Sequence, residues 1–280
     1  MPKTPFVLES RLRAVEILAL WEGRVSNARL RELFGVQIVQ ASRILNHYRR
    51  RFPDALHAAS ATHYRAASAL KPVLSQGHIS EYSQLLESGA GGHSAALVEF
   101  LPTDFVVVDR RIFATLREAA ESGCGVSAHY HSFSRPQGID RTLFPHTLVR
   151  AGRRWHVRAW CAGKKEFSDF VLGRFTRASL VNEPAPVAPT ADKAWQKMVP
   201  VRLVAHHELP EPQQRILRTE YFAGAQARRI STRAALVPYL IQDLRAAIDP
   251  QREHPPDFQI EVANLAEIRP WLFPGADTSQ

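Results

Sequence analysis

Polar and basic side chains suited to nucleic acid recur at helical spacing near the amino end of the chain. At about 100° per residue, Val39, Gln40, Arg43, Asn46 and Arg50 fall on one side of a helix. Glutamine, arginine and asparagine match base edges in the major groove of DNA, and arginine also suits phosphates. An ordinary helical hairpin with a solvated polar face is the alternative. The candidate DNA contacts of this stretch are Gln37, Val39, Gln40, Ser42, Arg43, Asn46, His47, Arg49 and Arg50.

Two short helices joined by a tight turn must position these side chains. Ser26 is a natural N-cap of the first helix, because its hydroxyl accepts from a backbone N–H of the first turn. Gly35 stands where that helix ends and the backbone needs a positive φ. The second helix begins near Gln37. The apolar residues expected to pack between them are Leu30, Leu33, Phe34, Ala41, Ile44, Leu45 and Tyr48.

The flanking segments complete a predicted winged helix-turn-helix domain over residues 1–66. Residues 9–22 predict a first helix whose apolar spacing lets it pack on the other two. Residues 56–64 predict a short hairpin, the wing, although the hairpin lacks a strong turn dipeptide. His63 and Arg65 of the wing are then candidate contacts to the DNA backbone.

The charge of the chain is concentrated in the same region. The net charge is +9, and residues 1–65 hold eleven Lys and Arg against five Asp and Glu, so this quarter of the chain carries +6. A localised basic excess favours a polyanion through phosphate contacts and counterion release. The placement of the charge therefore supports double-stranded DNA as the partner.

Composition excludes several other classes of protein. No apolar run approaches the roughly 18 residues of a membrane span, and the amino end lacks the pattern of a signal peptide. Cys124 and Cys161 alone do not make a disulfide framework. We expect a cytoplasmic protein with no membrane partner. Because HExxH, Walker A, G-x-S-x-G and paired-cysteine patterns do not occur, we expect no catalytic residue, no cofactor and no enzyme activity.

One histidine pair deserves comparison with metal sites. His129 and His131 share a strand face, and an H-x-H pair on a strand can ligate zinc. No third histidine, cysteine or carboxylate stands nearby in sequence, so we predict no metal site.

The rest of the chain predicts an α+β multidomain protein. Residues 67–96 are expected to be a helical linker, with a short helix at 79–86 and a glycine-rich piece at 88–94. Residues 97–185 predict a small β-barrel, because a helix at 110–121, closed by Gly123, precedes several short strands. These strands are expected at 126–133, 144–149, 154–161 and 166–172.

A proline-rich break at 183–189 separates the last predicted domain, residues 186–280. Strands are expected at 201–205, 228–230 and 258–262, and a helix at 212–221. Ser231 or Thr232 is expected to cap a further helix. That helix would carry Leu236, Leu240, Leu244 and Ile248 on one stripe.

Residues 126–174 resemble the WYL domain, a small Sm-like β-barrel of bacterial transcription regulators. The family's Trp-Tyr-Leu motif stands here as Trp155-His156-Val157, within a longer matching pattern at 144–146, 158–161 and 167–174. Residues 34–35 and 40–43 look like the winged helix of the WYL-domain repressors associated with the BREX and CBASS anti-phage systems. Residues 230–240 are similar to the dimerisation domain of the same repressors. The resemblance thus covers nearly the whole chain.

This resemblance implies a homodimeric repressor of an anti-phage defence operon that reads an inverted-repeat operator, with the WYL domain as sensor. It further implies a nucleotide or oligonucleotide effector, and a bacterial protein associated with the nucleoid. The family's pocket positions carry over to Tyr130, Ser132, His146, His156, Arg158 and Arg174, with His156 replacing the family tyrosine. Hydroxyl, imidazole and guanidinium groups of this kind can bind phosphate oxygens and base edges. Tyr130 and Ser132 could instead be buried with satisfied hydroxyls.

Two other functions stay open at this point. One is a transcriptional activator that responds to single-stranded DNA after damage. The other is a non-catalytic accessory of a nucleic-acid-processing enzyme. The operator, the effector and the direction of its effect do not follow from the sequence.

Overall fold

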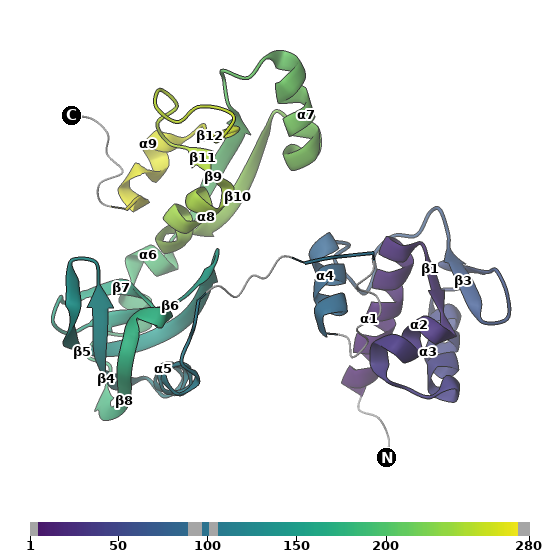
Figure 1. Ribbon diagram of the computed structural model, residues 1–280, viewed down its shortest axis with the longest axis horizontal. Helices are drawn as coiled ribbons and strands as arrows, with labels where there is room; N and C mark the ends of the chain where they lie inside the picture. Colours follow the sequence, from purple (N-terminus) through teal and green to yellow (C-terminus); the bar gives the residue numbers. More distant parts are fainter. Residues whose placement is uncertain (1–4, 89–96, 101–105, 274–280) are drawn as a thin grey trace. The chain divides into compact units, whose positions relative to one another are not determined.

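The computed structural model describes residues 5–88, 97–100 and 106–273, in two compact units, Met1–Leu101 and Pro102–Gln280 (Figure 1). Most of the predicted glycine-rich linker piece lies outside the described residues. Among the helices that the structure describes, none combines the length and apolar character that a membrane span requires.

The first unit contains the predicted helix-turn-helix. Ser26 caps α2, its hydroxyl accepting from Arg29 N, and Gly35 ends α2 with φ of 60°, both as predicted. The first helix starts earlier than expected, at Pro5. The elements in order are α1 (Pro5–Glu22), β1 (Arg24–Ser26), α2 (Asn27–Phe34), α3 (Ile38–Arg51), β2 (Leu56–Ala58), β3 (His63–Ala66) and α4 (Ile79–Ser88).

The core of this unit lies between α1, α2 and α3. The predicted apolar faces are buried, and Tyr48 of α3 and Leu30 of α2 are completely enclosed. Tyr82 and Leu85 of α4 pack against the same core, so residues 79–88 form the predicted helix and join the first unit.

The wing is present as a hairpin of β2 and β3. Strand β3 is central in a three-stranded sheet of order β1-β3-β2, and all pairs are antiparallel. The sequence did not predict β1, which is only three residues long. This strand pairs with β3 of the wing and leads directly into the start of α2.

The second unit begins with a five-stranded antiparallel sheet of order β7-β6-β5-β4-β8 and the helix α5. Helix α5 ends at Gly123, as predicted, and buries Leu116 against the sheet. Strand β5 is longer than expected, and β8 was not predicted. The elements are α5 (Arg110–Ser122), β4 (Cys124–Ser132), β5 (Arg135–Ala151), β6 (Arg154–Cys161), β7 (Glu166–Val171), the 3-10 turn η2 (Leu172–Arg174) and β8 (Phe175–Pro184).

The expected Sm-like barrel is not confirmed. Strands β7 and β8 are the two edges of the sheet, and no pairing joins them in the part of the chain that the structure describes. The hydroxyl of Tyr130 in β4 accepts a hydrogen bond from Val171 N at the end of β7, at 3.2 Å. The end of β7 is thus bonded to a side chain of β4, whereas closure of a barrel would require β7 to pair with β8.

The remaining residues form a four-stranded sheet of order β10-β9-β12-β11. The prediction that Ser231 or Thr232 caps a helix is wrong, because both residues pair with β9 as part of β10. Helix α8 begins directly after Leu236, which makes no side-chain capping hydrogen bond, and ends at Leu244, so Ile248 lies beyond it. The elements are α6 (Lys193–Gln196), β9 (Met198–Ala205), α7 (Glu211–Phe222), β10 (Ala227–Arg233), α8 (Val237–Leu244), β11 (Ala246–Ala247), β12 (Ile260–Val262) and α9 (Leu265–Ile268).

Candidate nucleic-acid interface and effector site

The predicted polar stripe lies on the solvent side of α3. Val39 is 59 % exposed, and Arg43, Asn46 and His47 are exposed on successive turns. Gln40 is half-buried and Gln37 is the N-cap residue. The opposite side of α3 is packed in the core, which fixes the direction in which the stripe points. The structure therefore presents most of the predicted base-contacting side chains together on one exposed surface.

Ser42 has a different environment from the rest of the stripe. The side-chain amide of Asn27 donates to Ser42 Oγ at 2.6 Å and to the carbonyl oxygen of Ile38 at 3.1 Å. Asn27 is only 7 % exposed. These two bonds fix the start of α3 against the start of α2. The sequence did not predict this role of Asn27, because Asn27 approaches Ser42 only through the tertiary fold.

The three consecutive arginines at the end of α3 differ in their contacts. The guanidinium of Arg49 lies 4.5 Å from the centre of the Tyr64 ring and donates to the Tyr64 hydroxyl, so Arg49 links α3 to the wing. Arg51 pairs with Glu9 of α1. Arg50 is exposed and has no hydrogen bond or ion pair within the described residues. Arg50 is thus the arginine of the three that can meet a phosphate without breaking an existing contact.

A row of basic side chains crosses the wing sheet. Arg24 of β1 lies opposite Arg65 of β3, which in turn lies opposite His57 of β2, and all three are exposed. His63 contacts the hydroxyl of Thr62 through Nδ1, at 3.0 Å. The sequence predicted His63 and Arg65 but missed Arg24 and His57. Only the strand register places these two beside Arg65.

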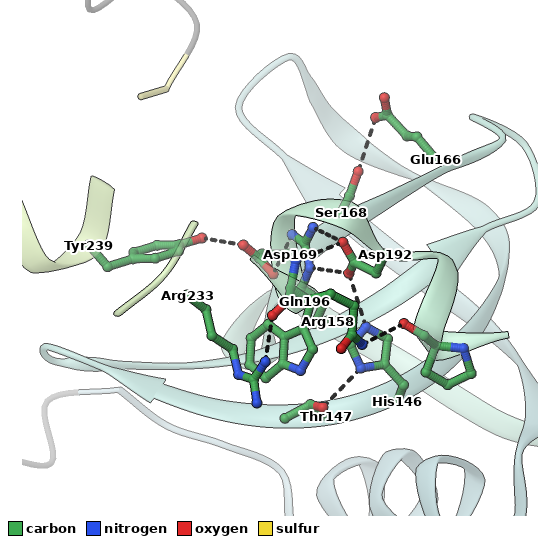
Figure 2. A network of polar contacts seen from close by, with 12 residues as sticks. His146, Thr147, Arg158, Glu166, Ser168, Asp169, Asp192, Gln196, Arg233 and Tyr239 are labelled. Carbon is green, nitrogen blue, oxygen red and sulfur yellow. Dashed lines mark hydrogen bonds and ion pairs between the residues drawn. The ribbon is translucent and has the colours of Figure 1, made fainter. Parts of the chain in front are cut away.

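Three of the predicted effector contacts lie in or beside a buried cluster in the second unit (Figure 2). Arg158 of β6 donates through Nε and Nη2 to both carboxylate oxygens of Asp192, at 2.6 and 2.9 Å. Its Nη1 donates to Asp169 of β7 at 3.2 Å, and Asp169 accepts from the Tyr239 hydroxyl at 3.1 Å. His146 of β5 contacts Asp192 through Nε2 at 3.2 Å. The cluster joins the five-stranded sheet to α6 and α8.

The protonation states of this cluster follow from burial and pairing. Burial alone raises the pKa of Asp192, but the hydrogen bonds and charge of Arg158 outweigh it and hold that pKa below its usual range. For His146, burial is the largest influence and lowers the pKa, although Asp192 acts in the opposite direction. His146 is therefore neutral at pH 7, with a proton on Nε2 facing the carboxylate. The positive charge of Arg158 is paired with the carboxylate of Asp192 inside the protein.

His156 is enclosed beside the cluster. It is 4 % exposed, and its ring lies 4.8 Å from the Tyr239 ring. Its Nδ1 is buried with no hydrogen-bond partner in the described part of the chain. Burial lowers the pKa of His156, as do the charges of Arg154 and Arg174, while Asp169 acts in the opposite direction. An uncharged imidazole therefore occupies this position at pH 7.

The other predicted effector contacts are spread over two places. Tyr130 is in the core, where its ring packs against Phe170 and Phe175. Ser132, at the end of β4, accepts from Arg135 N. Arg174 of η2 lies 4.6 Å above the ring of Phe133, which is 88 % exposed. The six residues therefore do not line one pocket. Phe133 is an exposed aromatic neighbour of Arg174 that no pattern in the sequence indicated.

Three family models match consecutive parts of the chain. Residues 8–88 match the BrxR transcriptional regulator winged helix-turn-helix domain, residues 111–180 the WYL domain, and residues 198–268 the BrxR transcriptional regulator C-terminal dimerization domain. Two of the three descriptions name a transcriptional regulator.

Whole-chain relatives agree with these models. The chain is 29 % identical over 272 residues to proteins named DNA-binding transcriptional repressor CapW from Escherichia coli and Pseudomonas aeruginosa, covering 93 % of this chain and 90 % of theirs. A protein of the same name from Stenotrophomonas maltophilia is 28 % identical over 280 residues, 96 % of this chain and 94 % of its own. Among solved structures, proteasome accessory factor B/C of Arthrobacter aurescens matches with 16 % identity and a TM-score of 0.29. The match covers 94 % of this chain but only 48 % of that protein, so the chain spans about half its length.

Proposed function

We propose that this chain, which carries the winged helix-turn-helix, WYL and C-terminal dimerization domains of the BrxR-type regulators, is a sequence-specific DNA-binding transcriptional repressor. The observation that carries the proposal is the exposed polar stripe of α3, where Arg43, Asn46 and Arg50 are exposed and make no side-chain hydrogen bond or ion pair with the residues that the structure describes. The name shared by the whole-chain relatives supports the same function.

Within this proposal the side chains of α3 have distinct roles. Gln37, Gln40 and Arg43 lie toward the amino end of the helix and contact base edges in the major groove. Val39 supplies an apolar contact beside them. Asn46, His47 and Arg50 hold the sugar-phosphate backbone. Ser42 and Arg49 act through other residues, because Asn27 and Tyr64 already engage them. We propose them as positioning residues for the helix and the wing.

The wing contributes phosphate contacts in this account. Arg65 and His63 were expected there, and the register adds Arg24 and His57 to the same sheet. A row of three basic side chains across a small sheet supplies positive charge without base specificity.

We propose a homodimer as the active form. The match of residues 198–268 to a dimerization domain supports this arrangement. Two copies of α3 related by a two-fold axis read the two halves of an inverted repeat. The half-sites of such an operator lie about 34 Å apart, or a multiple of that distance.

We further propose that a nucleotide or oligonucleotide effector controls DNA binding through the WYL domain. Arg174 and Phe133 offer a cation over an exposed ring, which suits a phosphate and a stacked base, and Ser132 directly precedes Phe133 in the chain. Arg158 and His146, by contrast, are engaged with Asp192. We assign Arg158 and His146 to the contact between the five-stranded sheet and Asp192, through which the effector signal would pass. Tyr130 and His156 are assigned to the packing around this contact. The regulated genes in this proposal are an anti-phage defence operon.

A gel shift on the DNA upstream of the chain's own gene tests the DNA-reading role. Arg43→Ala is expected to weaken binding by about 1–3 kcal/mol, roughly 5- to 150-fold, and to relax preference at one base pair. Arg51→Ala removes the same charge from a residue paired with Glu9 and serves as the matched control. An equal loss for Arg43→Ala on operator and on random DNA would contradict base reading.

The effector and the sign of regulation need separate tests. Oligonucleotides and cyclic nucleotides are titrated into the same gel shift, and Arg174→Ala is expected to abolish any response while DNA binding is kept. A reporter behind the upstream DNA is then measured in a strain lacking the gene. Increased expression agrees with a repressor, whereas loss of induction would identify an activator.

A further inference from the structure

The 3-10 turn η2 joins β7 to β8, and its three residues have three different environments. Leu172 is 1 % exposed and lies in the core between α5 and the five-stranded sheet. Arg174 is the cation assigned above to the effector. Gly173, between them, lies against Val106 and Val107, through which the chain from the first unit enters α5. One short turn thus contacts both the proposed effector site and the connection between the two units.

The contact at Gly173 leaves no room for a side chain. A Cβ atom placed on Gly173 would lie 2.8 Å from Cγ1 of Val106 and 3.1 Å from the carbonyl oxygen of Val107, both closer than ordinary van der Waals contact. The valine side chain is stiff about χ1, so it does not turn aside easily. Gly173 is not among the described glycines with a positive φ. Glycine is therefore needed here for close approach of two segments rather than for an unusual backbone conformation.

The segment in contact with η2 leads directly into α5. Val108 packs against the core of the five-stranded sheet. The carboxylate of Asp109 caps α5 and accepts from the backbone N–H groups of Arg111 and Ile112, at 2.8 and 3.0 Å. Val107, by contrast, is 90 % exposed. The chain is thus fixed from Val108 onward, and the contact with η2 limits the directions that the residues before it can take.

The backbone on both sides of η2 is fixed, whereas the Arg174 side chain is replaceable in its contact. The backbone N–H of Val171 donates to the Tyr130 hydroxyl at 3.2 Å, and Phe175 is buried against the Tyr130 ring. The guanidinium of Arg174 lies over Phe133, which is 88 % exposed. A cation–π contact at so exposed a ring is weak, so an anion that pairs with the guanidinium can replace it. Movement of Arg174 then acts on its neighbour in η2.

We propose that η2 couples the effector to DNA binding: an anionic ligand that engages Arg174 shifts Gly173 against Val106 and Val107 and so redirects the connection to the DNA-binding unit. The inference rests on the proposed function, because it takes Arg174 as an effector contact. Gly173 acts as a positioning residue and touches neither ligand nor DNA. Close-packed groups do not compress, so a small shift of η2 displaces the segment beside it. In a dimer each connection limits where its α3 can reach, so the displacement changes affinity for two half-sites bound together.

Gly173→Ala in the full chain imitates the displaced state without a ligand. The added methyl group forces Val106 and Val107 away, so the dissociation constant for the upstream DNA should change by at least about fivefold, the lower end of usual allosteric coupling. The change should have the same direction as the effect of an active oligonucleotide on the parent chain, and that oligonucleotide should then have little further effect. Gly163→Ala is the matched control, because a Cβ at Gly163 meets nothing within 4 Å.

A second substitution separates displacement of the connection from general damage to the fold. Val106→Ala removes the Cγ1 atom that the new Cβ would meet, so the chain with both Gly173→Ala and Val106→Ala should recover most of the parent's affinity for the upstream DNA. Melting temperatures of the parent and the variants, measured on the same preparations, show that each chain is folded. This comparison needs no effector, so it decides the coupling also where no oligonucleotide alters DNA binding by the parent chain.

The outcomes separate this inference from the function on which it rests. Unchanged affinity of Gly173→Ala, or a change that Val106→Ala leaves in place, would overturn the coupling while DNA reading by α3 stands. An oligonucleotide that acts on Gly173→Ala as strongly as on the parent chain would overturn it as well. A parent chain that does not bind the upstream DNA would instead contradict the proposed function, and the inference with it.

Discussion

At the scale of single residues, Arg50 and Arg43 should affect DNA binding differently although they lie on the same stripe. Arg50 is assigned to a phosphate, so Arg50→Ala should weaken binding to operator and random DNA by the same factor. The slope of the logarithm of the binding constant against the logarithm of salt concentration should become shallower by about one. Binding isotherms at several salt concentrations measure this slope, and an unchanged slope would remove Arg50 from the phosphate contacts.

His156 predicts a pH dependence of stability. Burial lowers its pKa below the value of about 6.5 in an unfolded chain, so the unfolded state binds more protons as the pH falls. His156 therefore makes its full contribution to the free energy of unfolding above about pH 6.5. This contribution decreases as the pH falls below that value.

His156→Phe is expected to flatten this dependence. The ring contact with Tyr239 is kept and the unpartnered Nδ1 is removed, so stability at pH 7.5 should be equal or higher. Urea unfolding at pH 7.5 and 5.5 compares the variant with the parent chain, and His78→Gln on the surface is the control. Equal loss of stability in parent and variant would show that His156 does not titrate as described.

Whether a side chain is exposed or buried was predictable where it depended on helical spacing. Arg43, Asn46 and Arg50 are exposed on α3 because Ile44 and Tyr48 on its other side are buried, and both sets follow from one periodicity. The partners of Ser42, Arg49 and Arg158 were not predictable, since Asn27, Tyr64 and Asp192 approach them only through the tertiary fold. A polar residue in a suitable motif position can thus be engaged within the protein.

At the scale of elements, Glu16 of α1 holds the segment after the wing. It is completely buried, and its carboxylate accepts from the backbone N–H groups of Val73, Leu74 and Ser75, at 2.8 to 3.2 Å. The Tyr48 hydroxyl lies 3.5 Å from the same carboxylate. A buried charge is tolerated where several donors surround it.

Glu16→Gln should destabilise the first unit by about 2 kcal/mol or more, because an amide N–H₂ then faces backbone donors. Urea unfolding of the full chain, followed by hydrogen exchange of the backbone amides in α1, α2 and α3, measures the loss in this unit. Glu87→Gln on the exposed side of α4 is the matched control and should change stability by less than about 0.5 kcal/mol. A Glu16→Gln chain as stable as the control would contradict the role of Glu16.

Elements were predictable where a local signal agreed with the tertiary structure. Gly123 ends α5 and Gly35 ends α2, both with positive φ, as the sequence indicated. The cap signal of Ser231 and Thr232 failed because pairing of β10 with β9 outweighs a local preference. Strand β8 was missed because it is mostly exposed at the sheet edge and lacks a clean alternation.

At the scale of the whole molecule, domain content was more predictable than the contacts between domains. The charge of the amino-terminal quarter and the motif around Trp155 identified two modules from sequence alone. The proline-rich break at 183–189 predicted a linker, yet Asp192, three residues further on, is 2 % exposed and pairs with Arg158. Arg158 and Asp192 are distant in sequence, and no local pattern predicts such a pair.

A footprint of the full chain on the DNA upstream of its own gene tests the central claim most directly. The account predicts two protected major-groove segments related by a two-fold axis. They should be one helical turn of about 34 Å apart, or a multiple of it, and Arg43→Ala should weaken both equally. A single protected segment that Arg43→Ala leaves intact would contradict the proposal that two copies of α3 read DNA.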